Sequence, residues 1–501
     1  MQIYEAISIG LYMLLMIAIG IYSYRKSTST SEEFLIGGRK LGPLVTALSA
    51  GAADMSGWLL MGLPGAMYFT GLSSAWIAIG LTIGAYLNYV LVAPRLRIYT
   101  EVAQNAITLP VFFQNRYKDK QHILKITSSI FILIFFTLYT SAGMVSGGKL
   151  FESAFGMDYL TGVLVTSLVV ILYTFIGGFL AVSLTDFIQG TIMVVALLIV
   201  PAVAIFEIGG TADTIALIQS KGDHYLSLFK GTTIIGIFSL LAWGLGYFGQ
   251  PHILVRFMAI DNPKDLIKAK NIGISWMVLT VLGALSIGLV GIAYLIKFDN
   301  STMQIFDASN REAETIFIYF ARGLFHPFVG GFLLSAILAA VMSTISSQLL
   351  VTSSSLTEDI YKAFINRKAT PKNLLIASRI SVLIVAVIAL ALSLQPRDNI
   401  LNLVGNAWAG FGAAFGPLVL LSLLYKKSSK AGALTGMLVG GFTVLIWIYF
   451  EHPFKDWYEL IPGFTLSLIA HIVVSRFTYE PNLIVDNEFD EVEKMKKTVM
   501  K

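Results

Sequence analysis

The sequence predicts an all-α polytopic membrane protein. Of its 501 residues, 56% are hydrophobic and only 13% are charged. A soluble chain would have about 25% charged residues. The hydrophobic residues gather in runs of about 20, which is the length that a helix needs to cross the hydrocarbon core of a bilayer. Composition and run length together therefore indicate a bundle of membrane-spanning helices.

Thirteen apolar runs are long enough to span. They lie near residues 3–23, 43–70, 73–94, 125–152, 158–177, 184–207, 232–255, 273–296, 323–355, 373–394, 399–424, 430–450 and 459–475. The first run has no preceding basic segment and no small-residue cleavage site, so we expect a retained span rather than a signal peptide. The ninth is longer than a span, and we expect it to continue into a cytoplasmic helical end. We expect one transmembrane domain over 1–475 and a charged tail over 476–501.

The basic residues predict the orientation. Most of the 35 lysines and arginines fall between spans on the side of the tail, Arg39, Arg97, Arg116 and Arg256 among them. The positive-inside rule makes that side cytoplasmic, so an odd number of spans puts the N-terminus outside. A count of twelve would exchange the two sides part-way along the chain and erase the asymmetry. The net charge of +5 therefore indicates orientation, not nucleic-acid binding.

Several function classes are excluded. The chain has no cysteine, which rules out disulfides, thiolate metal sites and cysteine nucleophiles. It has no Walker loop, so ATP is not the expected energy source. The six histidines show no metal-ligand spacing, and the tail contains no catalytic motif. We expect neither an enzyme nor an organic cofactor.

The second span contains a carboxylate at a weak point of its helix, in AADMSGW (52–58). A charge at the centre of a spanning helix costs about 2.5–3.5 kcal/mol, so Asp54 indicates a cation, a proton or a partner side chain. Alternatively, Asp54 lies off-centre and caps a half-helix. Ser56 and Gly57 could end one half-helix and start the next. Carbonyls before such a break suit sodium, and amides after it suit a substrate carboxylate.

The seventh span is also breakable. LLAWGLGYFGQPHIL places Trp243, Tyr247 and Pro251 at steps of four with three glycines between them, which predicts one aromatic face on a soft helix. Such a face favours an apolar wall for a small solute, although aromatic stripes also serve ordinary packing. Interrupted helices at matching places of two halves point to a midplane binding site. The alternative is that these glycines only allow close helix packing.

The ninth span contains a dense group of hydroxyls. Ser343 and Thr344 follow Ala340 by about one turn in SAILAAVMSTISSQLL. Two hydroxyls and a carbonyl could serve a sodium ion, because hard cations take oxygen ligands. Alternatively, each hydroxyl bonds the carbonyl of the preceding turn and has no further role.

Four segments together resemble the solute:sodium symporter family, most closely its bacterial sodium/proline branch. They are AADMSGW, WGLGYFGQPHIL, SLTDFIQG and SAILAAVMSTISSQLL, and the similarity covers essentially the whole chain. The resemblance implies thirteen spans and a LeuT-like core of two inverted five-helix repeats, about 43–207 and 232–424, with broken second and seventh helices. It also implies sodium-coupled uptake of L-proline by alternating access across the bacterial cytoplasmic membrane.

The resemblance further implies roles for individual residues. Its sodium site maps onto the carbonyls of Ala52, Met55 and Ala340 and the hydroxyls of Ser343 and Thr344, and Asp54 matches an acidic residue needed for sodium coupling. Positions associated with proline map onto Ser56, Gly57, Trp58, Tyr139, Trp243, Tyr247 and Pro251. Arg39 and Asp186 match positions linked to gating or coupling at the inner side. Na⁺, L-proline and lipid are the implied partners, with no obligate protein partner.

Three alternatives stay open at this point. The cargo could be another small carboxylate or a sugar. The coupling ion could be the proton, with Asp54 as the titrating group. A membrane sensor could use a similar domain as its input, but it should contain a regulatory module, and the segment after the last span leaves no room for one.

Overall fold

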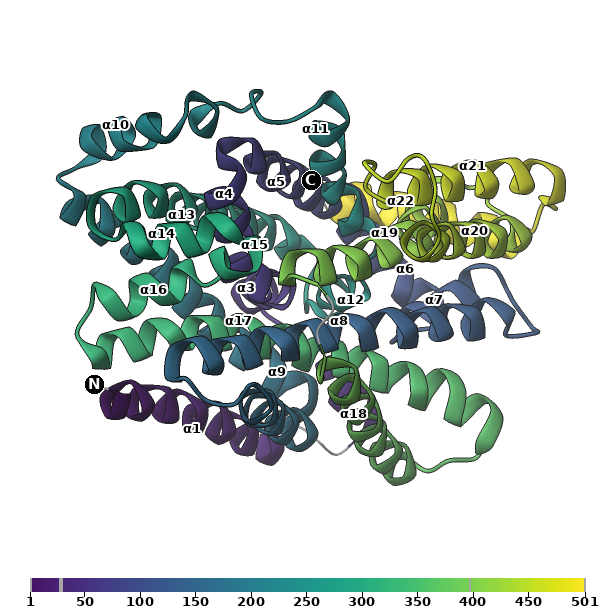
Figure 1. Cartoon of the computed structure of the whole chain (residues 1–501). Coiled ribbons are helices and arrows are strands. Elements are labelled where there is room, and N and C mark those ends of the chain that lie inside the picture. Colours follow the sequence, from purple (N-terminus) through teal and green to yellow (C-terminus); the bar gives the residue numbers. More distant parts are fainter. Residues whose placement is uncertain (1, 27–29, 396–397, 500–501) are drawn as a thin grey trace.

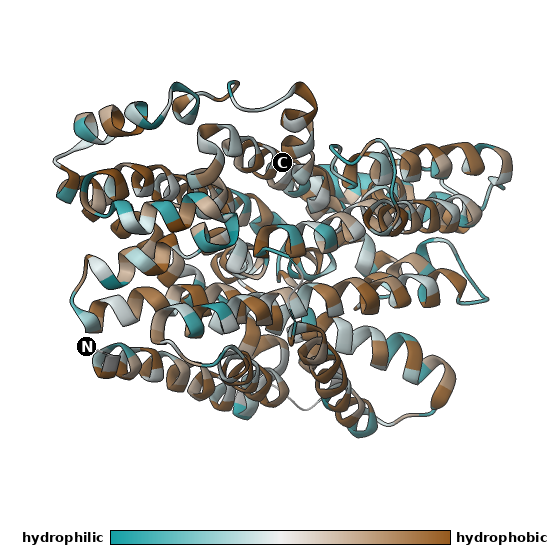
Figure 2. Ribbon diagram, viewed as in Figure 1, coloured by the Kyte–Doolittle hydropathy of each residue, from teal (hydrophilic) through white to brown (hydrophobic). Residues whose placement is uncertain are grey.

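The computed structural model describes residues 2–26, 30–395 and 398–499. Every regular element in these ranges is helical, and the one extended pairing is an isolated bridge between Leu41 and Ile260. Long helices such as α1, α8 and α17 lie side by side across the view of Figure 1. Hydrophobic residues dominate the helices, and hydrophilic residues gather in their connections and in the tail (Figure 2).

The helices of the first half run from α1 to α10. Their bounds are α1 Gln2–Lys26, α2 Ser31–Ile36, η1 Gly37–Arg39, α3 Pro43–Asp54, η2 Trp58–Gly62, α4 Leu63–Thr70, η3 Gly71–Ser74, α5 Ala75–Leu87, η4 Asn88–Val92, α6 Ala93–Val102, α7 Leu109–Arg116, α8 Ile123–Phe155, α9 Tyr159–Ile208 and α10 Thr211–Lys221.

The second half runs from η5 to the tail helix α22. Its bounds are η5 Asp223–Leu226, α11 Ile234–Leu241, η6 Ala242–Gly249, α12 Pro251–Ala259, η7 Pro263–Asp265, α13 Leu266–Phe298, α14 Asn300–Ala308, α15 Asn310–Ala313, α16 Ile316–Gly323, α17 Pro327–Ser354, η8 Ser355–Ile365, α18 Pro371–Ser393, α19 Ile400–Leu424, α20 Lys430–Tyr449, α21 Leu460–Thr478 and α22 Leu483–Val499.

The described helices confirm the many-spanning, all-helical class. Ten of them are long and apolar enough to cross a membrane, or eleven if one bent pair counts as a span. Two of the ten are long: Trp58–Val102 has 45 residues and Tyr159–Ile208 has 50. The second of these contains a non-helical residue, Gly178, with φ 59° and ψ −152°, close to where we expect one span to end and another to begin. The count of thirteen stays a prediction.

Both predicted breaks are present. In the second predicted span, α3 ends at Asp54, and Met55 has φ −79° and ψ 78°, outside the helical region. In the seventh, η6 ends at Gly249 and Gln250 is extended, so α12 bends away by 45°. Pro251 starts α12, where a missing N–H costs nothing.

Glycines let η6 approach α5 closely. A Cβ on Gly244 would lie 2.1 Å from the Gly80 carbonyl oxygen, and one on Gly84 would lie 2.1 Å from the Gly244 carbonyl oxygen. Any side chain at these positions would force the two backbones apart. The glycines of the seventh predicted span therefore allow close helix packing, which was the alternative interpretation. They also lie next to a break in the helix.

Four arginines that the sequence placed in connections are buried. Arg39, Arg97, Arg116 and Arg256 are between 0% and 7% exposed. All four donate to backbone carbonyl oxygens, which satisfies part of each guanidinium away from water. All four lie in helical elements, η1, α6, α7 and α12, so their assignment to loops between spans was wrong. The tail forms the helix α22, which packs against α6.

Candidate functional site

The break in the second predicted span leaves a carbonyl free. In a continuous helix the amide of Ser56 would bond the carbonyl of Ala52. Here it donates instead to the carbonyl of Asp54, at 3.0 Å. The Ala52 carbonyl oxygen accepts from the hydroxyl of Ser343 on α17, at 2.7 Å. The break thus turns a backbone oxygen toward a neighbouring helix.

The two α17 hydroxyls share one carbonyl. Ser343 Oγ lies 3.0 Å and Thr344 Oγ1 lies 3.1 Å from the Ala340 carbonyl oxygen. Together with Ala52, four of the five oxygens of the predicted sodium set are tied into one buried group by hydrogen bonds. Met55, the fifth residue, is buried at the break itself.

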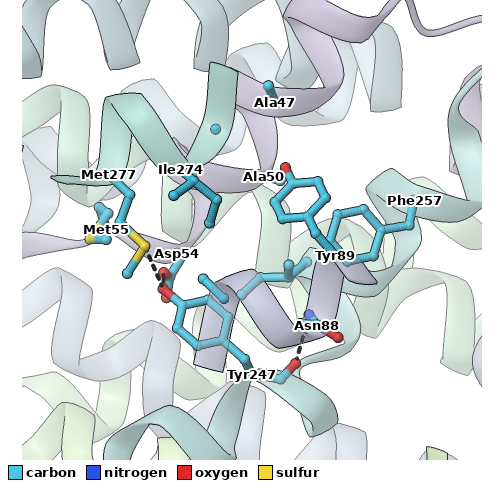
Figure 3. A pocket seen from close by; sticks show the side chains of 14 residues that line it. Ala47, Ala50, Asp54, Met55, Asn88, Tyr89, Tyr247, Phe257, Ile274 and Met277 are labelled. Carbon is cyan, nitrogen blue, oxygen red and sulfur yellow. Dashed lines mark hydrogen bonds between the residues drawn. The ribbon is translucent and has the colours of Figure 1, made fainter. Parts of the chain in front are cut away.

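Asp54 is paired with the seventh predicted span. The hydroxyl of Tyr247 donates a short hydrogen bond to Asp54 Oδ2 and also contacts the thioether of Met277 (Figure 3). The indole N–H of Trp58 donates to the Asp54 carbonyl oxygen, at 3.2 Å. Asp54 Oδ1 is buried and has no hydrogen-bond partner among the described residues. The carboxylate therefore joins the two breaks but keeps one free oxygen.

A small cavity lies beside this carboxylate (Figure 3). Its volume is about 30 Å³, and its lining includes Asp54, Asn88, Tyr89, Tyr247 and Met277. Asn88 Oδ1 and the Tyr89 hydroxyl are likewise buried without partners in the described chain. A buried water molecule needs about 10–15 Å³ of such space. The cavity has room for a water or an ion but not for a bulky solute.

Aromatic rings also pack at the two breaks. The ring centroids of Trp58 and Trp243 are 6.3 Å apart, and Trp243 stacks on Tyr458 at 5.4 Å. Trp408 donates its indole N–H to the Trp243 carbonyl oxygen, at 2.8 Å, and lies edge-on to Tyr247. Tyr458 lies just before α21, and Trp408 lies in α19. Neither was predicted, because no local motif marks them.

The remaining predicted substrate residues lie in two places: Ser56 and Gly57 lie next to α8, and Pro251 lies at another cavity. Ser56 lies beside the buried hydroxyl of Tyr139 on α8, and a Cβ on Gly57 would lie 2.5 Å from the Ser146 hydroxyl. Pro251, by contrast, lines a separate cavity with Thr108 and Ser354. The predicted single face is wrong at Pro251, because Gln250 is extended and α12, which Pro251 starts, bends away from η6 by 45°.

Arg39 lies just before α3 and links this segment to the end of α12. Its guanidinium donates to the carbonyl oxygens of Met258 and Ala106, at 2.6 and 2.8 Å, and also to Thr100 and Asn105. Next to it, the amide of Leu41 bonds the carbonyl of Ala259 across the extended bridge. These bonds join the segment before α3 to α12 and to the segment after α6.

Asp186 belongs to a second buried network. Its Oδ2 accepts from Ser49 on α3, at 2.7 Å, and from Arg256 on α12, at 3.2 Å. Arg256 also donates to Ser347 on α17. Both charges are fully buried. Arg256 was missed because the charge count treated it as a loop residue; its place inside the apolar run HILVRFMAI is the signal that could have found it.

Comparison with known proteins decides the family. The model of the sodium:solute symporter family matches residues 34–440. The chain belongs to this family. The symporter is 56% identical over 498 residues to the osmoregulated proline transporter OpuE of Bacillus subtilis, covering 99% of both chains. It is 54% identical to sodium/proline symporter 2 of Staphylococcus saprophyticus, covering 98% of this chain and 96% of that one.

Solved structures show the fold of the symporter. A Na⁺-coupled sialic acid symporter in a substrate-bound outward-open state superimposes with a TM-score of 0.80 at 17% identity, covering 95% of this chain and 98% of that one. The nucleobase-cation-symport-1 transporter Mhp1 does so with a TM-score of 0.58 at 12% identity, covering 92% and 99%. The LeuT-like fold is confirmed, and the chain is a transporter rather than an enzyme.

Proposed function

We propose that this symporter couples the inward movement of Na⁺ to the uptake of L-proline. The proposal rests on the family, on full-length relatives named as proline transporters, and on one structural observation. That observation is the Ala52 carbonyl, released by the helix break and facing the hydroxyl of Ser343.

Sodium binds at the junction of the break and α17. The ion replaces the hydrogen bond between Ser343 and Ala52 and gathers the carbonyls of Ala52, Met55 and Ala340 with the hydroxyls of Ser343 and Thr344. All five residues are buried and uncharged, so the ion supplies the only charge of the group. Binding orders the broken helix against α17. Asp54 acts on the opposite side of the break, where its free oxygen favours a cation nearby.

Proline binds next to the same break. Its carboxylate meets the amides after Ser56, at the start of the second half-helix, where the helix dipole favours an anion. Its ring lies against Trp58, Trp243 and Tyr247, with Tyr139 closing the side toward α8. Because ion and substrate share one backbone break, each stabilises the geometry that the other needs.

Transport then requires the end that holds Arg39 to open. The contacts of Arg39 with α12 and of Arg256 with α3 and α17 hold that end closed, and release of both frees the ion and proline. The membrane potential contributes about 2.3 kcal/mol per charge per 100 mV, enough to drive accumulation with one sodium ion. We place the tail in the cytoplasm of a bacterial cell, the N-terminus outside, and the two repeats at about 43–207 and 232–424.

Uptake of radiolabelled proline into liposomes tests the proposal. Purified protein should accumulate proline when Na⁺ is high outside and the interior is negative, and unlabelled proline should compete while other amino acids and sugars should not. Accumulation on a proton gradient alone, or equal competition by other solutes, would contradict the ion or the cargo.

A further inference from the structure

Arg116, at the end of α7, is a buried cation with free hydrogen-bond donors. It is 0% exposed, and only its Nε donates, to the Ser422 carbonyl oxygen at 3.0 Å. Its two terminal nitrogens, Nη1 and Nη2, have no hydrogen-bond partner among the described residues. The rings of Tyr99, Tyr117 and Phe489 lie 5.2–5.5 Å from its guanidinium carbon, which places the charge among π systems but gives the N–H groups no acceptor.

Arg116 is one of the residues that line a polar cavity of about 240 Å³ at the end of the bundle that holds the tail. Ser429 and Lys430 line it from the start of α20, and Tyr479, Asn482 and Asp486 line it from the tail. Because a buried charge without an acceptor is costly, an unpaired guanidinium beside such a cavity indicates a ligand that supplies oxygens.

Two helices start at this cavity. α20 begins after Ser429, whose hydroxyl accepts from the Gly432 amide, and α22 begins after Asn482, whose Oδ1 accepts from the Ile484 amide at 3.1 Å. Helix N-termini have a partial positive charge that adds to that of Arg116.

Two of the other charged side chains at the cavity, Lys430 and Asp486, are already engaged. Lys430 donates to Asp119 and Gln121, at 3.0 and 3.1 Å. Both oxygens of Asp486 accept from the Tyr479 hydroxyl, at 3.0 and 3.3 Å. Glu480, also in the lining, is exposed to solvent. Arg116 is therefore the one charged side chain of the lining that combines full burial with free donors in the described chain.

We propose that this cavity binds a phosphate-class anion, held by Nη1 and Nη2 of Arg116 between the starts of α20 and α22. The flat fork of a guanidinium matches two phosphate oxygens at once. The ligand is either free phosphate or the anionic headgroup of a phospholipid.

Occupancy would tie the tail to the bundle. The cavity has walls from both α20 and the tail, and Phe489 of α22 lies over the same guanidinium. An anion bound there adds to the ion pairs that already hold α22, such as Lys118 with Glu488 and Lys426 with Asp490. The site is separate from the breaks at Asp54 and Tyr247.

Three variants of the full-length protein test the site. Asn482→Asp adds a negative charge to the lining and keeps an acceptor for the start of α22, because aspartate also caps helices well. Arg116→Gln removes the guanidinium. Lys426→Gln is the matched control, because it removes one cation and one tail ion pair but no part of the lining.

Two arms distinguish the source of the anion. In detergent, unfolding temperature is measured as inorganic phosphate replaces chloride at constant ionic strength. In nanodiscs, it is measured as phosphatidylglycerol replaces phosphatidylcholine. We expect either phosphate or phosphatidylglycerol to raise the unfolding temperature of the wild type and of Lys426→Gln. Asn482→Asp and Arg116→Gln should bind that same anion at least tenfold more weakly.

The outcome names the ligand or rejects the site. A response to phosphate identifies the free ion, and a response to phosphatidylglycerol alone identifies a headgroup. No response in either arm, or an equal response in Asn482→Asp, would overturn the proposal. If Arg116→Gln does not fold, Asn482→Asp decides by itself.

Discussion

The hydroxyl of Ser343 on α17 donates a 2.7 Å hydrogen bond to the carbonyl oxygen of Ala52, the residue whose helical partner is lost at the break after α3. A carbonyl in a continuous helix already accepts an amide along the helix axis, whereas the Ala52 oxygen has lost that partner at the break and faces α17. The break is therefore the feature that makes two helices, distant in the sequence, meet through oxygens. In our account sodium takes the place of this bond.

The first prediction concerns the buried pair of Arg256 and Asp186. Removing one partner of such a pair leaves an uncompensated charge, which costs about 3–5 kcal/mol. Arg256→Gln or Asp186→Asn should each lower the unfolding temperature, with Asp186→Asn the larger loss, because a guanidinium left alone stays charged whereas a carboxyl left alone can take up a proton. The double variant should recover much of that loss. If the double variant loses as much stability as the two single variants together, the two side chains act independently.

The second prediction concerns the hydroxyl of Tyr247. Tyr247→Phe removes the one hydrogen bond to the Asp54 side chain in the described chain and should cost about 1–3 kcal/mol in stability. Tyr89→Phe is the control, because the Tyr89 hydroxyl lines the same cavity and has no hydrogen-bond partner in the described chain. Chemical unfolding of both variants measures the difference. Equal stability of the two would mean that the bond to Asp54 contributes nothing.

The third prediction concerns Trp243. Its ring faces Trp58 and stacks on Tyr458, and Trp243→Ala should weaken proline binding about tenfold or more with a smaller effect on sodium binding. Trp76→Ala, on α5 and paired with Phe229, is the control for losing a tryptophan elsewhere. Equilibrium binding of labelled proline at saturating Na⁺ measures the effect on proline, and the Na⁺ concentration for half-maximal binding measures the effect on sodium. An equal loss of proline and sodium affinity would indicate a structural role.

The fourth prediction concerns pH and Glu314, which lies between α15 and α16. Its carboxylate accepts from the amides of Ile400 and Leu401 at the start of α19, both at 3.2 Å. Burial raises the pKa of the Glu314 carboxyl from 4.5 to about 7, although these two bonds oppose the shift. The raised pKa means that the folded protein favours the protonated Glu314 carboxyl. The stability gained in this way is fully present below about pH 4.5 and is lost as the pH rises through about 7.

Unfolding temperatures at several pH values measure this effect. The wild type should lose stability relative to Glu314→Gln between pH 5 and pH 8, while Glu312→Gln, which changes a more exposed carboxylate, should follow the wild type. A constant difference between the wild type and Glu314→Gln over this range would reject the assignment.

Local sequence signals predicted the breaks well. Small and polar residues at Ser56 and Gly57, and glycines before Pro251, weaken a helix wherever they occur, so the breaks could be located without the fold. The hydroxyls of Ser343 and Thr344 could be singled out because their chemistry suits sodium.

Partners that arrive from distant helices could not be predicted in this way. Tyr458 and Trp408 reach the site through the packing of α19 and α21, and nothing in their own segments marks them. Arg256 was misassigned because a charge near the end of an apolar run usually lies in a loop, and only Asp186, 70 positions away, explains its burial. Pro251 does not lie on the predicted face because the break at Gln250 separates α12 from η6.

The most direct test of the account is a sodium titration of proline binding to Ser343→Ala/Thr344→Ala. Ser335→Ala/Thr352→Ala is the matched control, since both hydroxyls lie on α17 and bond only the preceding turn. We predict that the first variant needs at least tenfold more Na⁺ for half-maximal binding, with proline affinity at saturating Na⁺ changed far less, and that the control resembles the wild type. An unchanged sodium requirement in Ser343→Ala/Thr344→Ala would contradict a sodium site at the break.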